Sequence, residues 1–140
     1  MKVFVYGTLR TGDSRFGVES FEEMVAPEAY IDGFVMLDLG GFPGLVKTDD
    51  GEGRIRGEVH EYEHLEVLDR IEGYSEQNPE MGLYNRVQVP VFNDEGGVIC
   101  HDTWVYTFNG AHSFQKEEDV IESGDWFAHR GYYEKLSISE

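Results

Sequence analysis

The sequence predicts an α+β fold, in which a small mixed β-barrel or strongly curved sheet is flanked by two or three helices. Apolar residues occur mainly in short alternating or continuous runs, which is typical of strands. The 140 residues include 17 Gly and 4 Pro, a composition that favours many turns between short strands. A chain of this length supports one core, so a single domain over residues 1–140 is expected.

Strands and turns dominate the predicted order at the start of the chain. Residues 2–6 form an apolar, β-branched and aromatic run, which predicts a buried strand. Residues 16–25 carry apolar side chains at helical spacing, which predicts a short helix. Residues 30–39 are expected to form a strand, and residues 40–44, with three Gly and one Pro, a turn before a short extended piece that starts at Leu45.

A strand followed by a helix is predicted in the middle of the chain. Residues 55–62 alternate between apolar and polar side chains, with Ile55 and Val59 facing one side. The other side of this strand carries Arg56, Glu58 and His60. From Leu65 onward apolar residues recur every third position, which predicts an amphipathic helix that ends at Gly73.

The clearest local signal is a hairpin in the second half of the chain. Residues 83–92 and 98–108 are two strand-like runs around the polar, Gly-containing turn 93–97. Residues 117–121 are predicted to form one helical turn, whereas residues 126–136 fit either a helix or a strand.

Composition and charge limit the possible partners. The net charge of −17 argues against nucleic acid and against anionic membranes, and fits either a salt-adapted or an ordinary acidic protein. The one cysteine, Cys100, excludes an internal disulfide and fits a reducing compartment. No apolar stretch is long enough to span a bilayer. We therefore expect a cytoplasmic protein, and the sequence gives no indication of its oligomeric state.

The segment Tyr6-Gly7-Thr8-Leu9-Arg10 follows the first predicted strand and is a candidate binding loop. A strand that ends in Gly and Thr leaves backbone N–H groups unpaired, and Gly allows a ligand to approach them closely. Such groups can hold a carboxylate or a developing oxyanion. The alternative is a tight turn with an arginine on the surface.

Two motifs in the sequence resemble known binding sites, but each lacks one feature that its site requires. Residues 7–14 approach the phosphate-binding P-loop pattern, but Asp13 stands where that pattern needs Lys. His60-Glu61-Tyr62-Glu63-His64 matches the H-E-x-x-H zinc pattern, which requires both histidines on one face of a helix. Here the motif straddles a predicted strand end, so a zinc peptidase remains a minor hypothesis. Cys100 and His101 are neighbours on a strand and should point to opposite faces, which disfavours a nucleophile pair.

Glu72 is the carboxylate best placed for acid–base chemistry. It lies at the end of the predicted helix, where the helix dipole and Asp69, one turn back, both disfavour the ionised form. These conditions raise the pKa of a carboxylate toward neutrality, which suits a general base. The alternative is a solvated glutamate at a helix end.

Seven short motifs occur in one order along nearly the whole chain. They are residues 5–10, 40–46, 57–59, 68–74, 83–86, 104–106 and 123–126. With these motifs in this order, the chain resembles the gamma-glutamylcyclotransferase-like family. The resemblance implies a small mixed α+β barrel and the release of 5-oxoproline from a γ-glutamyl amide, without metal or cofactor. It also implies that Glu72 is the general base and acid, and that Tyr6, Gly7, Thr8 and Leu9 form the substrate loop.

Further binding residues are expected around this substrate. Arg10 and Arg86 are candidates for pairing with the substrate carboxylate, and Tyr84 and Tyr106 for lining the pocket. The expected partner is a small γ-glutamyl amide or amine conjugate, with a leaving amine that the resemblance does not identify. A non-catalytic module that binds a small ligand on the same scaffold is the alternative function.

Overall fold

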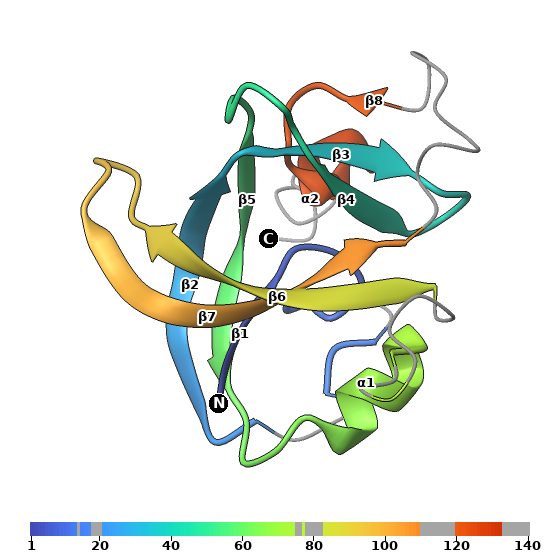
Figure 1. The fold of residues 1–140 in the computed structure, drawn as a ribbon, viewed down its shortest axis with the longest axis vertical. Helices are drawn as coiled ribbons and strands as arrows, with labels where there is room; N and C mark the ends of the chain where they lie inside the picture. Colours follow the sequence, from blue (N-terminus) through green and yellow to red (C-terminus); the bar gives the residue numbers. More distant parts are fainter. Residues whose placement is uncertain (14, 18–20, 75–76, 78–82, 110–119, 133–140) are drawn as a thin grey trace.

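The computed structural model describes residues 1–13, 15–17, 21–74, 77, 83–109 and 120–132, and its centre is a closed five-stranded barrel (Figure 1). The strands follow the order β1-β5-β2-β6-β7 around the barrel. Neighbours are antiparallel except where β1 meets β7, which closes the barrel in parallel. The bounds are β1 Lys2–Val5, β2 Glu23–Asp32, β5 Arg54–Glu61, β6 Tyr84–Phe92 and β7 Val98–Phe108.

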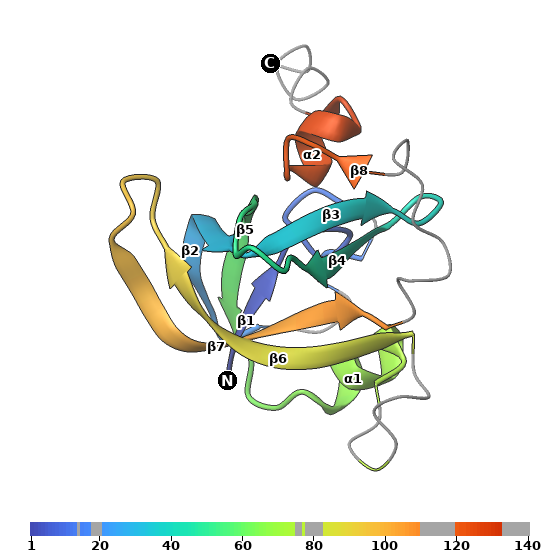
Figure 2. The same cartoon turned by 45° about the horizontal axis from the view of Figure 1, so that its top comes forward.

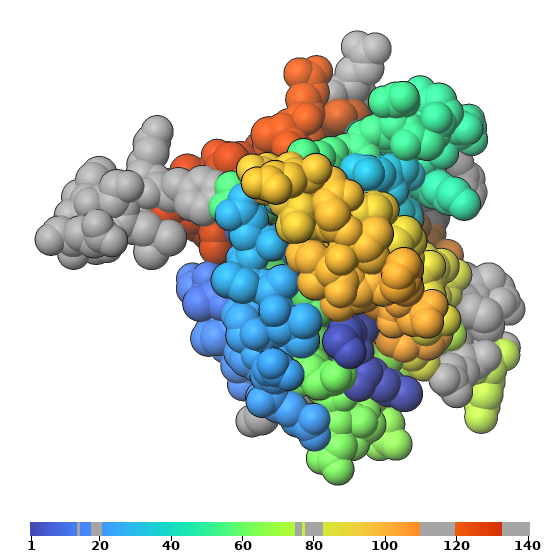
Figure 3. Space-filling model, turned by 90° about the vertical axis from the view of Figure 1, so that its left-hand side faces the viewer, coloured from blue at the N-terminus to red at the C-terminus, as the bar shows by residue number. Residues whose placement is uncertain are grey.

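A second, three-stranded sheet and two short helices complete the described fold. The sheet has the order β4-β3-β8, with β3 Phe34–Asp38, β4 Pro43–Lys47 and β8 Val120–Ile121. Helix α1 (Glu66–Glu72) and helix α2 (Trp126–His129) lie on opposite sides of the molecule (Figure 2). Figure 3 shows the outer face of the barrel, where the β6–β7 hairpin packs beside β2. Together these elements confirm the predicted α+β barrel.

The predicted β6–β7 hairpin and the predicted end of the helix at Gly73 are both confirmed. The β6–β7 hairpin turns at residues 93–97, where the side chain of Asn93 accepts hydrogen bonds from the Glu95 and Gly97 backbone N–H groups at 3.0 and 2.8 Å. Helix α1 ends because Gly73 adopts the left-handed conformation, with φ of 71°, and its N–H caps the last turn.

The helix predicted over residues 16–25 is wrong in the part that the structure describes. Residues 15–17 form a turn, and β2 already begins at Glu23, while residues 18–20 lie outside the described residues. The start of β2 pairs with β5, Glu23 opposite Glu61 and Met24 opposite His60. Hydrogen bonding along the barrel therefore overrides the helical spacing of this segment.

Two further element boundaries differ from the predictions. The single strand expected over residues 30–39 is divided at Gly33, whose φ of 88° lets the chain leave the barrel and enter the second sheet. The helical turn expected over residues 117–121 is wrong at residues 120–121, which form β8 against β3, whereas residues 117–119 lie outside the described part. The ambiguous segment 126–136 begins with α2, and its residues 133–136 lie outside the described part.

Side chains on opposite faces of β1 enter two different core clusters. Phe4 packs in the main cluster with Val59 and Val105, whereas Val3 and Val5 pack against Leu65, Leu68 and their neighbours. The second cluster holds α1 against the end of β1, and this contact brings the C-terminus of α1 toward the loop that follows the strand. Over the described residues, neither helix has the length and apolar character needed to cross a membrane.

Candidate active site

A pocket opens where β1 ends and α1 ends. Its empty volume, counted to the open mouth, is about 410 Å³. The lining residues are Phe4, Val5, Tyr6, Gly7, Thr8, Leu9, Arg15, Phe42, Pro43, Glu72, Tyr84 and Tyr106. The structure therefore brings Glu72, the residues of the predicted substrate loop and both predicted tyrosines around one cavity. Their chemical roles stay predictions.

Glu72 is partly buried at the last position of α1. Burial disfavours its charged form and raises its pKa from 4.5 to about 7, against a smaller lowering by the guanidinium of Arg15. The raised pKa was expected from the helix dipole and Asp69, but its principal cause is removal of the carboxyl group from water. The value suits a group that exchanges protons near neutral pH.

The loop after β1 passes close to the first residue of β4. A Cβ atom on Gly7 would lie 2.5 Å from Cγ of Pro43, so this position requires glycine. The loop is closed by two backbone hydrogen bonds, from Arg10 N–H to the Gly7 carbonyl (3.0 Å) and from Arg15 N–H to the Thr8 carbonyl (2.8 Å). Within the described part of the chain, the N–H groups of residues 7–9 have no acceptor. They can therefore donate to an anion or an oxyanion.

The three tyrosines of the pocket already use their hydroxyl protons. The Tyr6 hydroxyl donates to the carbonyl of Tyr106 at 2.6 Å, and the Tyr84 hydroxyl donates to the carbonyl of Pro43 at 2.7 Å. The Tyr106 hydroxyl donates to Oδ1 of Asp69 at 2.7 Å. Because carbonyl and carboxylate oxygens only accept, each phenol oxygen keeps only lone pairs for a further partner. The phenols can therefore only accept from a ligand that reaches them, and the Tyr6 oxygen already accepts one hydrogen bond from the backbone of Leu45.

These phenols also share the electrostatic field of Glu72. Burial raises the pKa of Tyr6, Tyr84 and Tyr106 above the ordinary value, and the negative charge of Glu72 raises each of them further. All three therefore stay neutral at physiological pH. One carboxylate and three phenol oxygens make this side of the pocket suited to a donor-rich cation such as an ammonium group.

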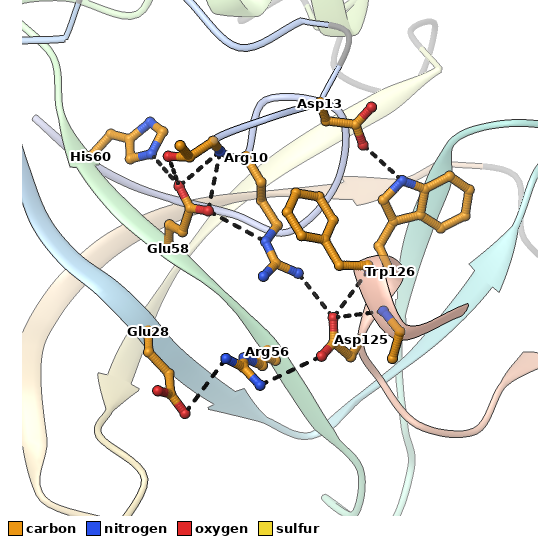
Figure 4. A network of polar contacts seen from close by, with 11 residues as sticks. Arg10, Asp13, Glu28, Arg56, Glu58, His60, Asp125 and Trp126 are labelled. Atoms are coloured by element: carbon orange, nitrogen blue, oxygen red, sulfur yellow. Dashed lines mark hydrogen bonds and ion pairs between the residues drawn. The ribbon is translucent and has the colours of Figure 1, made fainter. Parts of the chain in front are cut away.

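Arg10 does not line the pocket, so the prediction that it pairs with a substrate carboxylate is wrong. Its side chain is buried, with Nη1 donating to Asp125 Oδ1 at 3.0 Å and Nε at 3.5 Å from Glu58 Oε2 (Figure 4). Its guanidinium also lies over the ring of Phe127, 3.8 Å from the centroid. These contacts make Arg10 an internal anchor.

Arg86 also lies outside the lining of this pocket, so its predicted contact with a substrate carboxylate has no support from the pocket. Its Nε lies 3.2 Å from Oδ1 of Asp69, the oxygen that accepts from Tyr106. The guanidinium packs over Trp104, 4.4 Å from the ring centroid. Arg86 therefore acts on the pocket through Asp69 and the orientation of Tyr106.

The H-E-x-x-H segment does not form the helix that a zinc peptidase requires. His60 lies on β5 and is fully buried, and α1 begins at Glu66, after His64. The Nε2 atom of His60 lies 3.0 Å from Oε1 of Glu58, and Nδ1 lies 3.1 Å from the hydroxyl of Tyr62. Among the described residues, no cluster of three potential ligands is arranged to hold a metal ion.

The Cys100–His101 prediction is confirmed. Cys100 is buried in the main core cluster and His101 is exposed, as expected for neighbours on a strand. The thiol is therefore not paired with the adjacent imidazole.

Sequence reasoning missed Arg15 as a pocket residue and Glu58 as a buried anchor. The alternation of β5 places Glu58 on the polar side of the strand and so predicts exposure, yet both Glu58 and His60 on that side are buried. Arg15 has no signal in the sequence either, because only the closure of the loop brings it back to the pocket.

Comparison with known proteins agrees with this architecture. The family model described as Gamma-glutamyl cyclotransferase, AIG2-like, matches residues 3–128. The gamma-L-glutamyl-butirosin B gamma-glutamyl cyclotransferase of Niallia circulans is 29% identical over 132 residues, covering 91% of this chain and 76% of that protein.

Solved structures show the same fold. YkqA from Bacillus subtilis has a TM-score of 0.66 and 26% identity, covering 99% of this chain and 42% of that one. This chain thus spans less than half the length of YkqA. An AIG2-like protein from Mus musculus has a TM-score of 0.57 at 21% identity, covering 89% of this chain and 86% of that one.

Proposed function

Because the chain belongs to the AIG2-like gamma-glutamyl cyclotransferase family, we propose that it releases 5-oxoproline from a γ-glutamyl amide, with Glu72 as general base and acid. The observation that supports the proposal is the shared pocket, which Glu72 lines together with residues 7–9, whose N–H groups have no acceptor among the described residues. A base and an oxyanion-binding backbone are the two features that intramolecular attack on an amide requires.

The reaction begins with a proton transfer. The substrate α-amine arrives mainly as ammonium, since its reference pKa is about 8. The Glu72 carboxylate accepts one proton from it, and the phenol oxygens of Tyr6, Tyr84 and Tyr106 are acceptors for the remaining N–H groups. A free amine nitrogen with an available lone pair results.

Ring closure then takes place within the substrate. The α-nitrogen forms a bond to the γ-carbonyl carbon, and the developing oxyanion accepts hydrogen bonds from the N–H groups of residues 7–9. Glu72 gives its proton to the departing nitrogen as the bond between that nitrogen and the γ-carbon breaks. The second proton of the attacking nitrogen leaves to solvent or to the product amine. No water or cofactor is consumed, and holding the reactive rotamer supplies part of the rate.

A non-catalytic binding module is the alternative function. It would be favoured if Glu72 were exposed or paired with a cation away from the loop. Glu72 is instead partly buried in the pocket, and no ion pair joins it to another described residue within 4.0 Å. These observations support catalysis.

The test is a direct measurement of product. Purified protein is incubated with a panel of γ-glutamyl amides, and 5-oxoproline is quantified by mass spectrometry for the wild type, Glu72→Gln and Glu66→Gln. Glu66 is the matched control because it lies exposed on the same helix. We expect Glu72→Gln to lower kcat by about 10²- to 10⁴-fold and Glu66→Gln to leave it unchanged. If no amide in the panel yields 5-oxoproline, or if Glu72→Gln stays fully active, the proposal is refuted.

A further inference from the structure

The pocket contains one cationic side chain among its described lining residues, Arg15. We propose that Arg15 is the specificity-determining residue that binds a carboxylate of the substrate. This inference rests on the proposed function, because it names the group that orients the substrate in the same pocket. It replaces the roles that the sequence suggested for Arg10 and Arg86, which lie outside the pocket lining.

The loop that carries Arg15 is held in place by partly buried contacts with β5 and α2 (Figure 4). The backbone N–H of Thr11 lies 3.1 Å from both carboxylate oxygens of Glu58, and the Thr11 hydroxyl donates to Oε1 at 2.9 Å. The indole Nε1 of Trp126 donates to Oδ2 of Asp13 at 3.1 Å. With the backbone N–H of Arg15 bonded to the carbonyl of Thr8, these contacts fix where the side chain of Arg15 begins.

The side chain of Arg15 is available to a ligand. It is exposed at the pocket, and no carboxylate of another described residue lies within 4.0 Å of it. Its charge nevertheless reaches the interior, since it lowers the pKa of both Glu72 and Tyr84. Guanidinium groups bind carboxylates in a bidentate geometry, with two parallel hydrogen bonds. The pocket is therefore polarised, with an anion-binding group at Arg15 and acceptors around Glu72.

This polarity couples substrate binding to the strength of the base. In the free enzyme Arg15 opposes the raised pKa of Glu72. A substrate carboxylate bound to Arg15 neutralises that charge, and Glu72 then becomes a stronger base when the pocket is occupied. The other titratable groups around Glu72 are Asp69 on its own helix and the neutral phenols of the pocket.

The carboxylate has two possible sources in a γ-glutamyl amide. One is the α-carboxylate of the glutamyl unit, which every substrate of this class carries. The other is an acidic group on the leaving amine. Kinetics on three substrates separate them: γ-glutamyl methylamide, γ-glutamylglycine and the α-carboxamide form of γ-glutamyl methylamide.

The variants are Arg15→Gln, Arg15→Lys and Arg70→Gln. Arg70 is the matched control because it is exposed on α1, two residues from Glu72, and does not line the pocket. We expect Arg15→Gln to raise KM by about 10- to 100-fold and Arg15→Lys to restore part of the loss. If Arg15→Gln raises KM for both γ-glutamyl methylamide and γ-glutamylglycine but not for the carboxamide, Arg15 binds the α-carboxylate. A rise for γ-glutamylglycine alone assigns it to the leaving amine. An unchanged KM for both carboxylate substrates overturns the proposal.

A second readout distinguishes binding from a structural role. Removing the positive charge should raise the pKa seen in the pH profile of kcat/KM for Arg15→Gln above the wild-type value, whereas Arg70→Gln should not shift it. Binding of L-5-oxoproline and its carboxamide by calorimetry needs no turnover. A wild type that binds 5-oxoproline through Arg15 but forms no product refutes the proposed function while supporting this inference. A wild type that shows neither turnover nor binding refutes both.

Discussion

Replacing Glu72 with Gln should stabilise the protein while it removes the proposed activity. In the folded state burial raises the pKa of Glu72 from 4.5 to about 7. The folded protein therefore binds this proton more tightly than the unfolded chain. Below pH 4.5 Glu72 is protonated in both the folded and the unfolded state, and it does not lower the free energy of unfolding. As the pH rises from 4.5 to about 7, the unfolded chain ionises first and folding loses stability, until the full cost is present above pH 7.

The size of this effect follows from the shift. A change from 4.5 to about 7 is 2.5 pKa units, and at 1.36 kcal/mol per unit this corresponds to about 3 kcal/mol above pH 7. The cost is about 1 kcal/mol at pH 5.5 and about 3 kcal/mol at pH 8.5. Gln has nearly the same shape and no charge. The difference in the free energy of unfolding between Glu72→Gln and the wild type should therefore grow by about 2 kcal/mol over this range.

Urea denaturation at half-unit pH steps from 5.5 to 8.5 measures this difference. Glu66→Gln, exposed on the same helix, is the control and should show no comparable pH dependence. A difference for Glu72→Gln that stays flat across the range would show that the carboxylate ionises in the folded protein as freely as in water. Glu72 would then not be a buried base.

Three further predictions follow from the same contacts. The pH profile of kcat/KM should rise through about pH 7, because Glu72 must be ionised to accept a proton, and fall again above about pH 8, where the substrate amine has lost the proton that Glu72 passes on; a profile that falls through pH 7 would contradict the base assignment. Gly7→Ala should lower the free energy of unfolding in urea by about 1–3 kcal/mol and reduce kcat/KM, because the added Cβ would lie 2.5 Å from Cγ of Pro43. Unchanged kinetics would show that the loop adapts freely. Arg10→Met should destabilise the fold by about 3–5 kcal/mol, since it removes a buried cation from the carboxylates of Glu58 and Asp125; a loss below about 1 kcal/mol would argue against its role as an anchor.

Several parts of the fold could be predicted from local signals alone. The β6–β7 hairpin is encoded by two strand-like runs around a polar, Gly-containing turn, and α1 by apolar spacing that stops at Gly73. Residues 16–25 carry an equally regular helical spacing, yet the part described from Glu23 onward is a strand. The reason is that β5 offers a pairing edge 30 residues or more along the chain, which no window of ten residues can reveal.

Part of the candidate site could also be predicted from the sequence. The order of short motifs pointed to Glu72 and to residues 6–9, and the structure places both around one pocket. The pattern of a strand or loop could not show that Arg10 and Arg86 lie outside the pocket lining, because it does not reveal whether a guanidinium pairs with an internal carboxylate. Arg10 pairs with Asp125, 115 residues away in the sequence, and Arg86 pairs with Asp69.

The sequence by itself determined the α+β class, the hairpin, the helix that carries Glu72 and the glycine that follows β1, because turn chemistry and apolar spacing act over a few residues. Only the tertiary structure decided that Glu72 is removed from water and that the phenol protons point to internal acceptors. It also decided that Arg15, rather than Arg10, lines the pocket. Burial and charge pairing depend on segments distant in the chain, and these come together only when the barrel closes.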